Sequence, residues 1–485
     1  MGKSFRVIHL VARISCAVTL LTVLAYASTS AFAQAPRGAF NPKYVFLFMA
    51  DGAGMAQLEI ARQYRRYIHN EGMVIVDKIL KEGHIGVMTT HAADSLSTDS
   101  AAAATAMAGG CKANVGALGM CADGTVATSA MELARRRGMK LGLITNSTVY
   151  DASPAAFVCH VPSRRNYPAI LERYLDMAPD VILGGGKDQF LPEGQLGGRR
   201  KDGVNLITKF ENKGYRHVGD RNELAGVPQG KVLGLFSRRD MSMELDRDKL
   251  TEPSVYDMTK QAIRLLREQN PTGFFAFIES ENMDTAGHLT DIASVIHDYR
   301  EFDRAVGLAY EFYKNYPRET LVLVTSDHDT GGPGFTLALK DLTSTKRYNR
   351  VAGTVADFKK IQAIGISLQK AARLIGRSPT AEAVDNLIRD YFPGFTLAPE
   401  YKEAILKRQP LSRTFYENPT AHALGMMIAN HTQVYWQTGA HTNQPVLVAA
   451  LGVGAENFSG YYDNADFGNK LKSLIDGRNI TARVQ

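Results

Sequence analysis

The stretch YVFLFMADGAG at residues 44–54 decides the fold, because a run of seven apolar residues is followed directly by Asp51 among glycines. An apolar run without polar alternation is typical of a strand that is buried on both faces of a sheet. In open α/β sheets, ligands bind beyond the carboxyl ends of such strands. The stretch therefore predicts a central strand with an acidic side chain placed at a ligand site.

The same kind of apolar run recurs along the chain and alternates with helical patterns. This alternation predicts an α/β fold, a three-layer sandwich with a central, largely parallel sheet and helices on both faces. Further strands are expected at residues 140–145, 180–183, 274–278, 321–325 and 445–451, and helices at 55–67, 129–137, 255–269 and 291–313.

One part of the chain departs from this alternation. Residues 357–408 are helical in pattern, charged and poor in strand signals. We therefore expect a helical cap, inserted at about residues 330–430 into a single catalytic domain that spans residues 34–485.

The N-terminus has the layout of a secretory signal peptide at residues 1–33. Lys3, Arg6 and Arg13 come with no acidic residue, an apolar stretch follows at 16–27, and an A-x-A site ends at Ala33. The apolar stretch is shorter than the ~20 residues that a membrane span needs. We expect a periplasmic or secreted protein without a membrane anchor after cleavage.

Charge and cysteine content narrow the class of protein. The formal net charge is +7, but the basic residues are spread out and form no run interleaved with aromatics, so no nucleic-acid-binding patch is predicted. Cys111 and Cys121 lie in one glycine-rich loop, where an oxidising compartment would allow a disulfide. Cys159 is expected to be a buried structural thiol.

Ser100 begins an alanine-rich run that follows Thr98 and Asp99. At the first turn of a helix, unpaired backbone N–H groups and the helix dipole stabilise an alkoxide or a bound phosphate. Ser and Asp are also the preferred helix N-caps, so a purely structural role is the alternative.

Oxygen and imidazole side chains follow nearly every predicted strand. Each one alone is well explained as a turn or cap residue, but together they would form one rim of metal ligands. Asp284 and His288, four residues apart, would share one helix face, which is metal-ligand spacing. Three histidines with carboxylates suit zinc, whereas an all-oxygen group suits magnesium. The remaining candidates are Asp51, Asp151, Ser153, Glu279, Asp327, His328 and His441.

Seven short segments in this order resemble those of the alkaline phosphatases, and they cover the chain from about residue 43 to 460. Only the region from roughly 330 to 420 looks divergent. The segments are residues 48–55, 98–102, 151–157, 160–164, 279–288, 325–328 and 439–442.

The resemblance implies metal-dependent hydrolysis of small phosphate monoesters at alkaline pH. It assigns Ser100 as the nucleophile that becomes a phosphoserine, and Arg164 as the side chain that binds phosphate oxygens. It also implies two zinc ions and one magnesium ion. One zinc would be bound by Asp51, Asp327 and His328, the second by Asp284, His288 and His441, and the magnesium by Asp51, Ser153 and Glu279. Members of the family are often homodimers, which leaves a dimer as an open expectation.

Two departures from the best-known bacterial members stand out. Ser153 replaces a Thr and keeps the hydroxyl, whereas Thr285 replaces a Lys that contacts phosphate through water, so weaker phosphate binding is expected.

A sulfatase is excluded because the Cys/Ser-x-Pro-x-Arg segment is missing at the strand ends. A phosphodiesterase of the same superfamily is the alternative, although such enzymes lack counterparts of Glu279 and Arg164. A non-catalytic phosphate or metal binder is a further alternative, but no nucleophile or zinc ligand has been lost.

Overall fold

The computed structural model describes residues 41–338 and 351–477 of the 485-residue chain. The predicted signal peptide at residues 1–33 lies outside the described residues. Among the helices that are described, none is long and apolar enough to cross a membrane.

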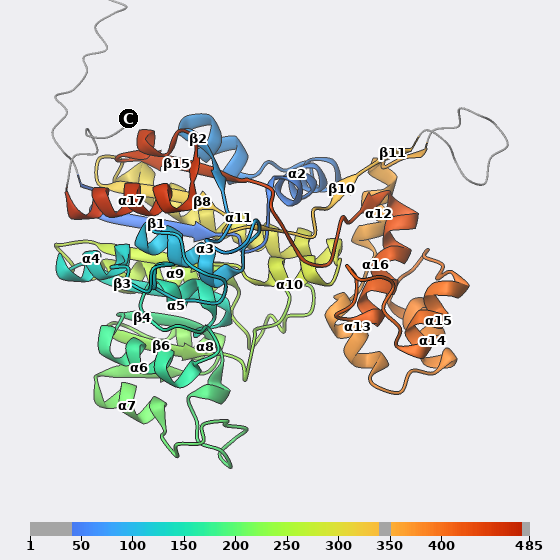
Figure 1. Cartoon of the computed structure of the whole chain (residues 1–485), viewed down its shortest axis with the longest axis horizontal. Coiled ribbons are helices and arrows are strands. Elements are labelled where there is room, and N and C mark those ends of the chain that lie inside the picture. The colour runs from blue at the N-terminus through green and yellow to red at the C-terminus, as the bar shows by residue number, and fades with distance from the viewer. Residues whose placement is uncertain (1–40, 339–350, 478–485) are drawn as a thin grey trace, which may run out of the picture. The chain divides into compact units, whose positions relative to one another are not determined.

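A ten-stranded sheet forms the centre of the fold (Figure 1). Its order is β16-β2-β15-β8-β1-β7-β3-β4-β6-β5, and β15 alone runs antiparallel to its neighbours. The predicted largely parallel sheet is thereby confirmed. The strands are β1 (Tyr44–Met49), β2 (His84–Thr89), β3 (Lys140–Thr148), β4 (Val181–Gly185), β5 (Tyr215–Val218), β6 (Lys231–Leu235), β7 (Phe274–Glu279), β8 (Thr320–Thr325), β15 (Val446–Gly452) and β16 (Gly460–Asp463).

The six strands expected from apolar runs are all present, whereas β2, β5, β6 and β16 were not predicted. Of these, β5 and β16 have only four residues each and lie at the two edges of the sheet. Strand β2 begins with two exposed residues, His84 and Ile85, so its sequence is not continuously apolar. Short or half-exposed strands give a weak periodic signal, which explains why β2, β5 and β16 were missed. Strand β6 has five residues, of which four are buried, so this reason does not apply to it.

Side chains of β1 alternate between two cores, one on each face of the sheet. Val45, Leu47 and Met49 pack in one core, and Phe46 and Phe48 pack in the other. Both cores need apolar partners, which is why the run at residues 44–50 contains no polar residue.

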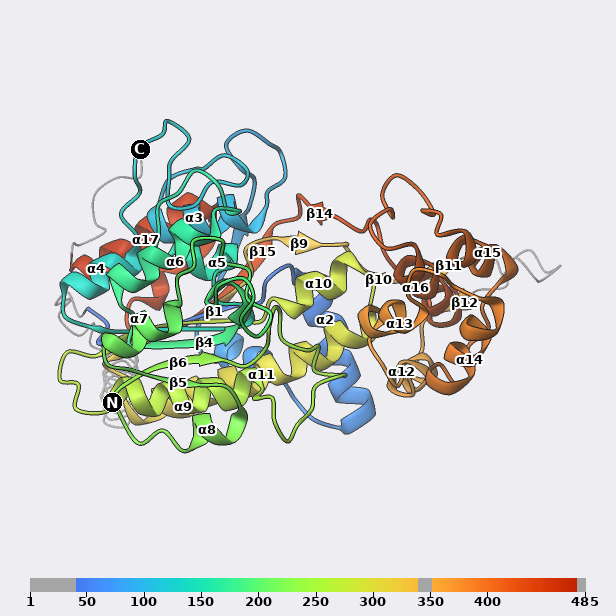
Figure 2. The same cartoon turned by 90° about the horizontal axis from the view of Figure 1, so that it is seen from below.

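Helices cover both faces, as Figure 2 shows from below. On one face lie α3 (Ser100–Gly109), α4 (Ala130–Arg136), α5 (Ala152–Ala156), α6 (Tyr167–Met177), α7 (Leu206–Asn212) and α17 (Asn464–Asp476). On the other lie α2 (Met55–Tyr64), η2 (Ile75–Leu80), α8 (Arg221–Ala225), α9 (Val255–Arg267) and α11 (Ile292–Asn315). Shorter helical elements are η1 (Arg65–His69), η3 (Lys187–Gln189) and η4 (Ala455–Phe458).

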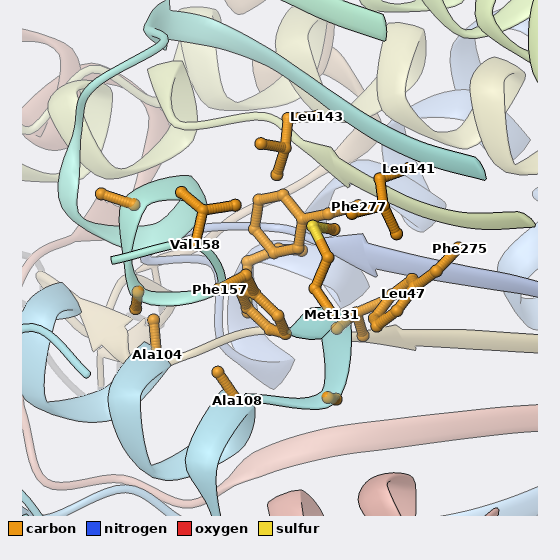
Figure 3. Close-up of a cluster of buried hydrophobic side chains, with 14 of the residues drawn as sticks. Leu47, Ala104, Ala108, Met131, Leu141, Leu143, Phe157, Val158, Phe275 and Phe277 are labelled. Atoms are coloured by element: carbon orange, nitrogen blue, oxygen red, sulfur yellow. The ribbon is translucent and has the colours of Figure 1, made fainter. Parts of the chain in front are cut away.

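All residues of the alanine-rich helix α3 are buried, and their small side chains allow neighbouring elements to pack close to the helix on several sides. Ala104 and Ala108 belong to the core that Leu47 and Phe275 also line (Figure 3). Against α17 the approach is closer still, because a Cβ atom at Gly468 would lie 2.3 Å from the carbonyl oxygen of Ala106. Small residues let backbones approach closely, so α3 is held on several sides.

Five helices lie between residues 355 and 432 (Figure 1). They pack around a core that includes Leu368, Val384, Ile405 and Leu424, and this core also takes in Ile60 of α2 and Ile296 of α11. At the base, β10 (Gly334–Phe335) pairs with β13 (Val434–Tyr435) and brings the two ends of this segment together. A second short pair joins β11 (Leu337–Ala338) to β12 (Val351–Ala352). The helices are α12 (Val355–Gln362), α13 (Leu368–Ile375), α14 (Ala381–Tyr391), α15 (Pro399–Lys407) and α16 (Pro419–Thr432).

Candidate active site

The site lies at the carboxyl ends of β1, β7 and β8, which are neighbours in the sheet. Asp51 follows β1, Glu279 ends β7, and Asp327 and His328 follow β8. Ser100 is the first residue of α3. All five are buried, and the parallel arrangement explains their convergence because it places strand ends of the same polarity at one edge.

Asp51, Asp327 and His328 form a first group of potential metal ligands, with one donor atom of each within 4.8 Å of the others. His328 Nε2 lies 3.2 Å from Asp327 Oδ2 and 3.6 Å from Asp51 Oδ1. These two carboxylate oxygens are buried and accept no hydrogen bond from any described residue. Unpaired buried carboxylate oxygens are costly, so the group fits a cation. Ser100 Oγ lies 3.2 Å from the same His328 Nε2.

A second group consists of Asp284, His328 and His441. The segment β14 (His441–Thr442) pairs with β9 (Asp329–Thr330), which stacks the rings of His441 and His328 with centroids 3.8 Å apart. His288, the third expected ligand of the second zinc, belongs to α10 (Asn282–His288). Its Nε2 lies 3.3 Å from Asp284 Oδ2 and 3.0 Å from His441 Nε2. Asp284, His288 and His441 therefore meet, and His328 belongs to both groups of potential ligands.

Hydrogen bonds orient two of these histidines. His441 Nδ1 donates to the Thr98 carbonyl at 2.7 Å, and His288 Nδ1 donates to the Gly439 carbonyl at 2.8 Å. A carbonyl oxygen only accepts, so Nδ1 of each ring carries a proton. In the neutral ring the lone pair of Nε2 then faces the cluster, as it does in a metal-ligating histidine. Burial would lower the pKa of His288, but the carboxylate of Asp284 outweighs it and raises this pKa to about 9, so His288 must lose its Nε2 proton to bind a metal.

The pKa values in the cluster show the effect of buried charge. Burial lowers the pKa of His328 and His441, so both imidazoles are neutral. Three carboxylates have raised pKa values, mainly because they are buried and to a smaller extent because neighbouring carboxylates repel them. The pKa of Asp51 is raised well above its ordinary value, that of Asp327 is raised to about 7, and that of Glu279 is raised to about 8. These carboxylates need cations nearby to stay ionised at neutral pH, which supports metal binding.

The residues expected to hold magnesium also converge. Ser153 Oγ donates to Asp51 Oδ2 at 3.0 Å, so Asp51 lies between this group and the first one. Glu279 Oε2 accepts a hydrogen bond from Thr145 at 2.5 Å, whereas its Oε1 is buried and has no donor among the described residues. An all-oxygen set of this kind fits a hard cation such as Mg²⁺.

Gly52 permits the close approach of the turn after β1 to Asp284 of α10. Its φ is +67°, and a Cβ atom at this position would lie 2.4 Å from Asp284 Oδ1. A side chain is therefore excluded on both conformational and steric grounds.

Arg164 is fixed by two carboxylates. It donates to Asp99 Oδ2 at 3.1 Å and to Asp151 Oδ1 at 3.0 Å. Burial alone would lower the pKa of Arg164, but the two carboxylates outweigh it and raise the pKa, so the guanidinium stays charged. Its side chain is 29% exposed, which leaves room for an anion to reach it.

Asp99, not Ser100, caps helix α3. Asp99 Oδ1 accepts hydrogen bonds from the backbone N–H groups of Ala102 at 3.0 Å and Gly116 at 3.1 Å. Asp99 is therefore the N-cap of α3, and the hydroxyl of Ser100 makes no capping hydrogen bond. The structural alternative for Ser100 is therefore removed.

Two carboxylates near the site were not predicted. Glu281 Oε1 accepts from Thr285 Oγ1 at 2.9 Å, whereas its Oε2 is buried and has no donor within the described residues. Asp240 accepts from Ser147, whose hydroxyl also lies 3.3 Å from Asp151. Glu281 stands three residues after the end of the strand predicted at residues 274–278, and this position could have marked it as a candidate. Asp240 lies in a loop and carries no sequence signal.

The loop that follows α3 is crosslinked by a disulfide between Cys111 and Cys121. His160 connects this loop to α4, since its ring lies 2.9 Å from the Gly119 carbonyl and 2.9 Å from Glu132 Oε1. Cys159 is buried and free, as expected, and burial raises the pKa of its thiol to about 12.

Comparison with known proteins identifies the family. The model of the family "Alkaline phosphatase" matches residues 42–476. Alkaline phosphatase 3 of Bacillus subtilis is 30% identical over 442 residues, which is 89% of each chain. The repressible alkaline phosphatase of Saccharomyces cerevisiae is 33% identical over 67% of this chain and 61% of its own length. The crystal structure of Thermus thermophilus alkaline phosphatase superposes with a TM-score of 0.81 at 27% identity, covering 92% of this chain and 96% of that one. The chain therefore belongs to the alkaline phosphatase family of metal-dependent phosphomonoester hydrolases.

Proposed function

We propose that this protein hydrolyses phosphate monoesters through a phosphoserine at Ser100. The observation that carries the proposal is the position of the Ser100 hydroxyl at the buried N-terminus of α3. There its Oγ lies 3.2 Å from His328 Nε2, beside the two groups of potential metal ligands.

The chain's own residues divide the reaction between them. Arg164 binds two non-bridging oxygens of the phosphate, and Asp99 and Asp151 hold its guanidinium plane in place. The Ser100 hydroxyl gives up its proton to solvent and its Oγ attacks phosphorus. The bond between phosphorus and the alcohol oxygen breaks, and this oxygen takes up a proton from solvent as the alcohol leaves. Water then attacks the phosphoserine, releasing inorganic phosphate and restoring the hydroxyl. The dipole of α3 favours the negative charge that develops on Ser100, but contributes at most ~2 kcal/mol.

The proposed ions are two zinc and one magnesium. Asp51, Asp327 and His328 would hold one zinc, and Asp284, His288 and His441 the other. Asp51, Ser153 and Glu279 would hold the magnesium. When bound, such cations neutralise charge in the transition state and lower the pKa of the oxygens that they contact. The buried, unpaired oxygens of Asp51, Glu279 and Asp327 support this assignment.

An alkaline optimum is part of the proposal. Metal ligands must be deprotonated to bind, and the nucleophile must lose its proton to attack, so activity is expected to fall as the pH drops. A pH–rate profile that peaks in acid would contradict this.

Adding Zn²⁺ and Mg²⁺ to metal-stripped protein tests the function, with 4-nitrophenyl phosphate and bis(4-nitrophenyl) phosphate as the two substrates. We expect hydrolysis of the monoester, dependent on the ions and abolished in Ser100→Ala. Faster hydrolysis of the diester would identify a phosphodiesterase instead. Hydrolysis of neither ester by the reloaded protein would leave only a binding function.

We further propose that residues 1–33 are removed on export and that residues 34–485 function in the periplasm or outside the cell. The disulfide between Cys111 and Cys121 supports an oxidising compartment. N-terminal sequencing of the protein from fractionated cells tests this, with Gln34 expected as the first residue. The homodimer stays a prediction, which light scattering of the purified protein tests.

A further inference from the structure

A shallow, largely open cavity of about 440 Å³ lies beside His441. One wall is the loop of Ser95, Leu96 and Ser97, which leads into α3 and Ser100. Thr414, from the segment between α15 and α16, and Asn443, which follows β14, also line it. Its volume falls within the range of ~300 to 1,000 Å³ that is usual for small-molecule sites.

Hydrogen bonds tie the walls of the cavity to His441 and His288. His441 donates to the carbonyl of Thr98, next to the Ser95–Ser97 wall. His288 donates to the carbonyl of Gly439, and the N–H of Gly439 donates to the carbonyl of Thr414 at 2.8 Å. The cavity is thereby held next to the Asp284, His288 and His441 cluster.

The lining is polar but has no charged carboxylate, ammonium or guanidinium group. Among the described residues, its side chains carry hydroxyls, amides and the imidazole of His441, and Leu96 is the single large apolar residue. Leu96 is 85% exposed and so adds little enclosed apolar surface. The side chain of Asn443 is exposed and makes no hydrogen bond with the described part of the chain. Its amide therefore offers both donors and an acceptor to a ligand.

We propose that this cavity binds the alcohol part of the phosphate ester and favours neutral, polyhydroxylated alcohols. Asn443 and Thr414 are its specificity-determining residues, because each presents a hydrogen-bonding group from an exposed position beside His441. This inference rests on the proposed function, since it concerns the leaving group of that reaction. The proposal also gives residues 355–432, which contain helices α12 to α16, a role in substrate binding, because Thr414 lies between α15 and α16. A second anionic group on the alcohol would find no cation among the lining residues.

A matched pair of primary-alcohol esters, sorbitol 6-phosphate and hexyl phosphate, tests the proposal. Wild type is expected to have the higher kcat/KM for the sorbitol ester. In Asn443→Ala and Thr414→Val, kcat/KM for this ester should fall between about 2-fold and 10-fold, the value of one lost hydrogen bond, while that for the hexyl ester changes little. Asn222→Ala, at an exposed position of α8, is the matched control and should change neither value.

Binding of the corresponding phosphonates, measured by calorimetry with Zn²⁺ and Mg²⁺ present, gives a second readout that does not need turnover. Selective binding of the sorbitol phosphonate without hydrolysis of any ester would support the cavity and refute the proposed function. Hydrolysis of both esters with a ratio unchanged by either variant would refute the cavity's role and leave the phosphatase intact. A wild-type preference for hexyl phosphate would also refute it.

Discussion

Ser100 and Ser129 each stand at the first turn of a helix, yet the structure predicts opposite consequences for their replacement by Ala. Ser129 is the N-cap of α4: its Oγ accepts from the Glu132 N–H at 3.1 Å and donates to the Phe157 carbonyl at 2.6 Å. Ser100 follows its cap, Asp99, and among the described residues its hydroxyl has one side-chain hydrogen-bond partner, His328, at 3.2 Å. Ser129 therefore has a structural role, whereas the hydroxyl of Ser100 is available as a nucleophile.

The magnitudes follow from these contacts. In Ser129→Ala, loss of the N-cap should lower the free energy of unfolding by about 1 kcal/mol. Loss of the hydrogen bond to the buried Phe157 carbonyl should lower it by about 1 kcal/mol more. Ser100→Ala loses no cap, so we expect the free energy of unfolding to fall by less than about 1 kcal/mol. Because Ser100→Ala removes the nucleophile, its kcat should be lower than that of wild type by a factor on the order of 10⁴ or more.

Thermal unfolding, kcat for 4-nitrophenyl phosphate and trapping of label from ³²P-phosphate measure the three expectations. Ser129→Ala should unfold at a lower temperature than wild type. At temperatures where it is folded, it should have the wild-type kcat and incorporate as much ³²P as wild type does. Ser100→Ala should unfold near the wild-type temperature, trap no label and be inactive. Full turnover by Ser100→Ala would exclude Ser100 as the nucleophile, and a loss of stability as large as that of Ser129→Ala would show that Ser100 has a structural role.

Three further predictions rest on other parts of the molecule. Chelation should lower the melting temperature, since a ligand present at 100 times its Kd stabilises by about 2.7 kcal/mol; an unchanged melting temperature would exclude resident metal. The hydrogen bond with Glu132 raises the pKa of His160, so its stabilisation is full below the ordinary pKa of 6.5 and is lost as the pH rises through the raised value. Burial would raise the pKa of Glu132, but His160 and Ser129 lower it, so its contribution is lost only as the pH falls through that lowered value. In His160→Gln, unfolding free energies measured at pH 6 and pH 9 should therefore differ less than in wild type, and an equal difference would contradict the pairing. Thr285→Lys should strengthen inhibition by phosphate about 3-fold to 10-fold through an added cation, and an unchanged inhibition constant would count against a role for this position.

Local sequence patterns predicted much of the sheet and the types of ligand. The run at residues 44–50 is apolar throughout because β1 faces two cores, so burial was readable from composition alone. Strand β2, by contrast, begins with exposed residues, and its place beside β15 depends on pairing with a distant segment. The antiparallel direction of β15 was likewise not predicted, because direction leaves no periodic signal in a short apolar strand.

The sequence by itself determined which side chains are available: a serine at a helix start, acids and histidines at strand ends, and an arginine after residues 151–157. Only the tertiary structure decided which of them meet. His441 reaches His328 because β14 pairs with β9, and Arg164 is fixed because Asp99 and Asp151 flank it. The cavity beside His441 also exists only after folding, since its walls are distant in sequence. The physical reason is that periodicity reports burial within one element, whereas a site depends on contacts between elements.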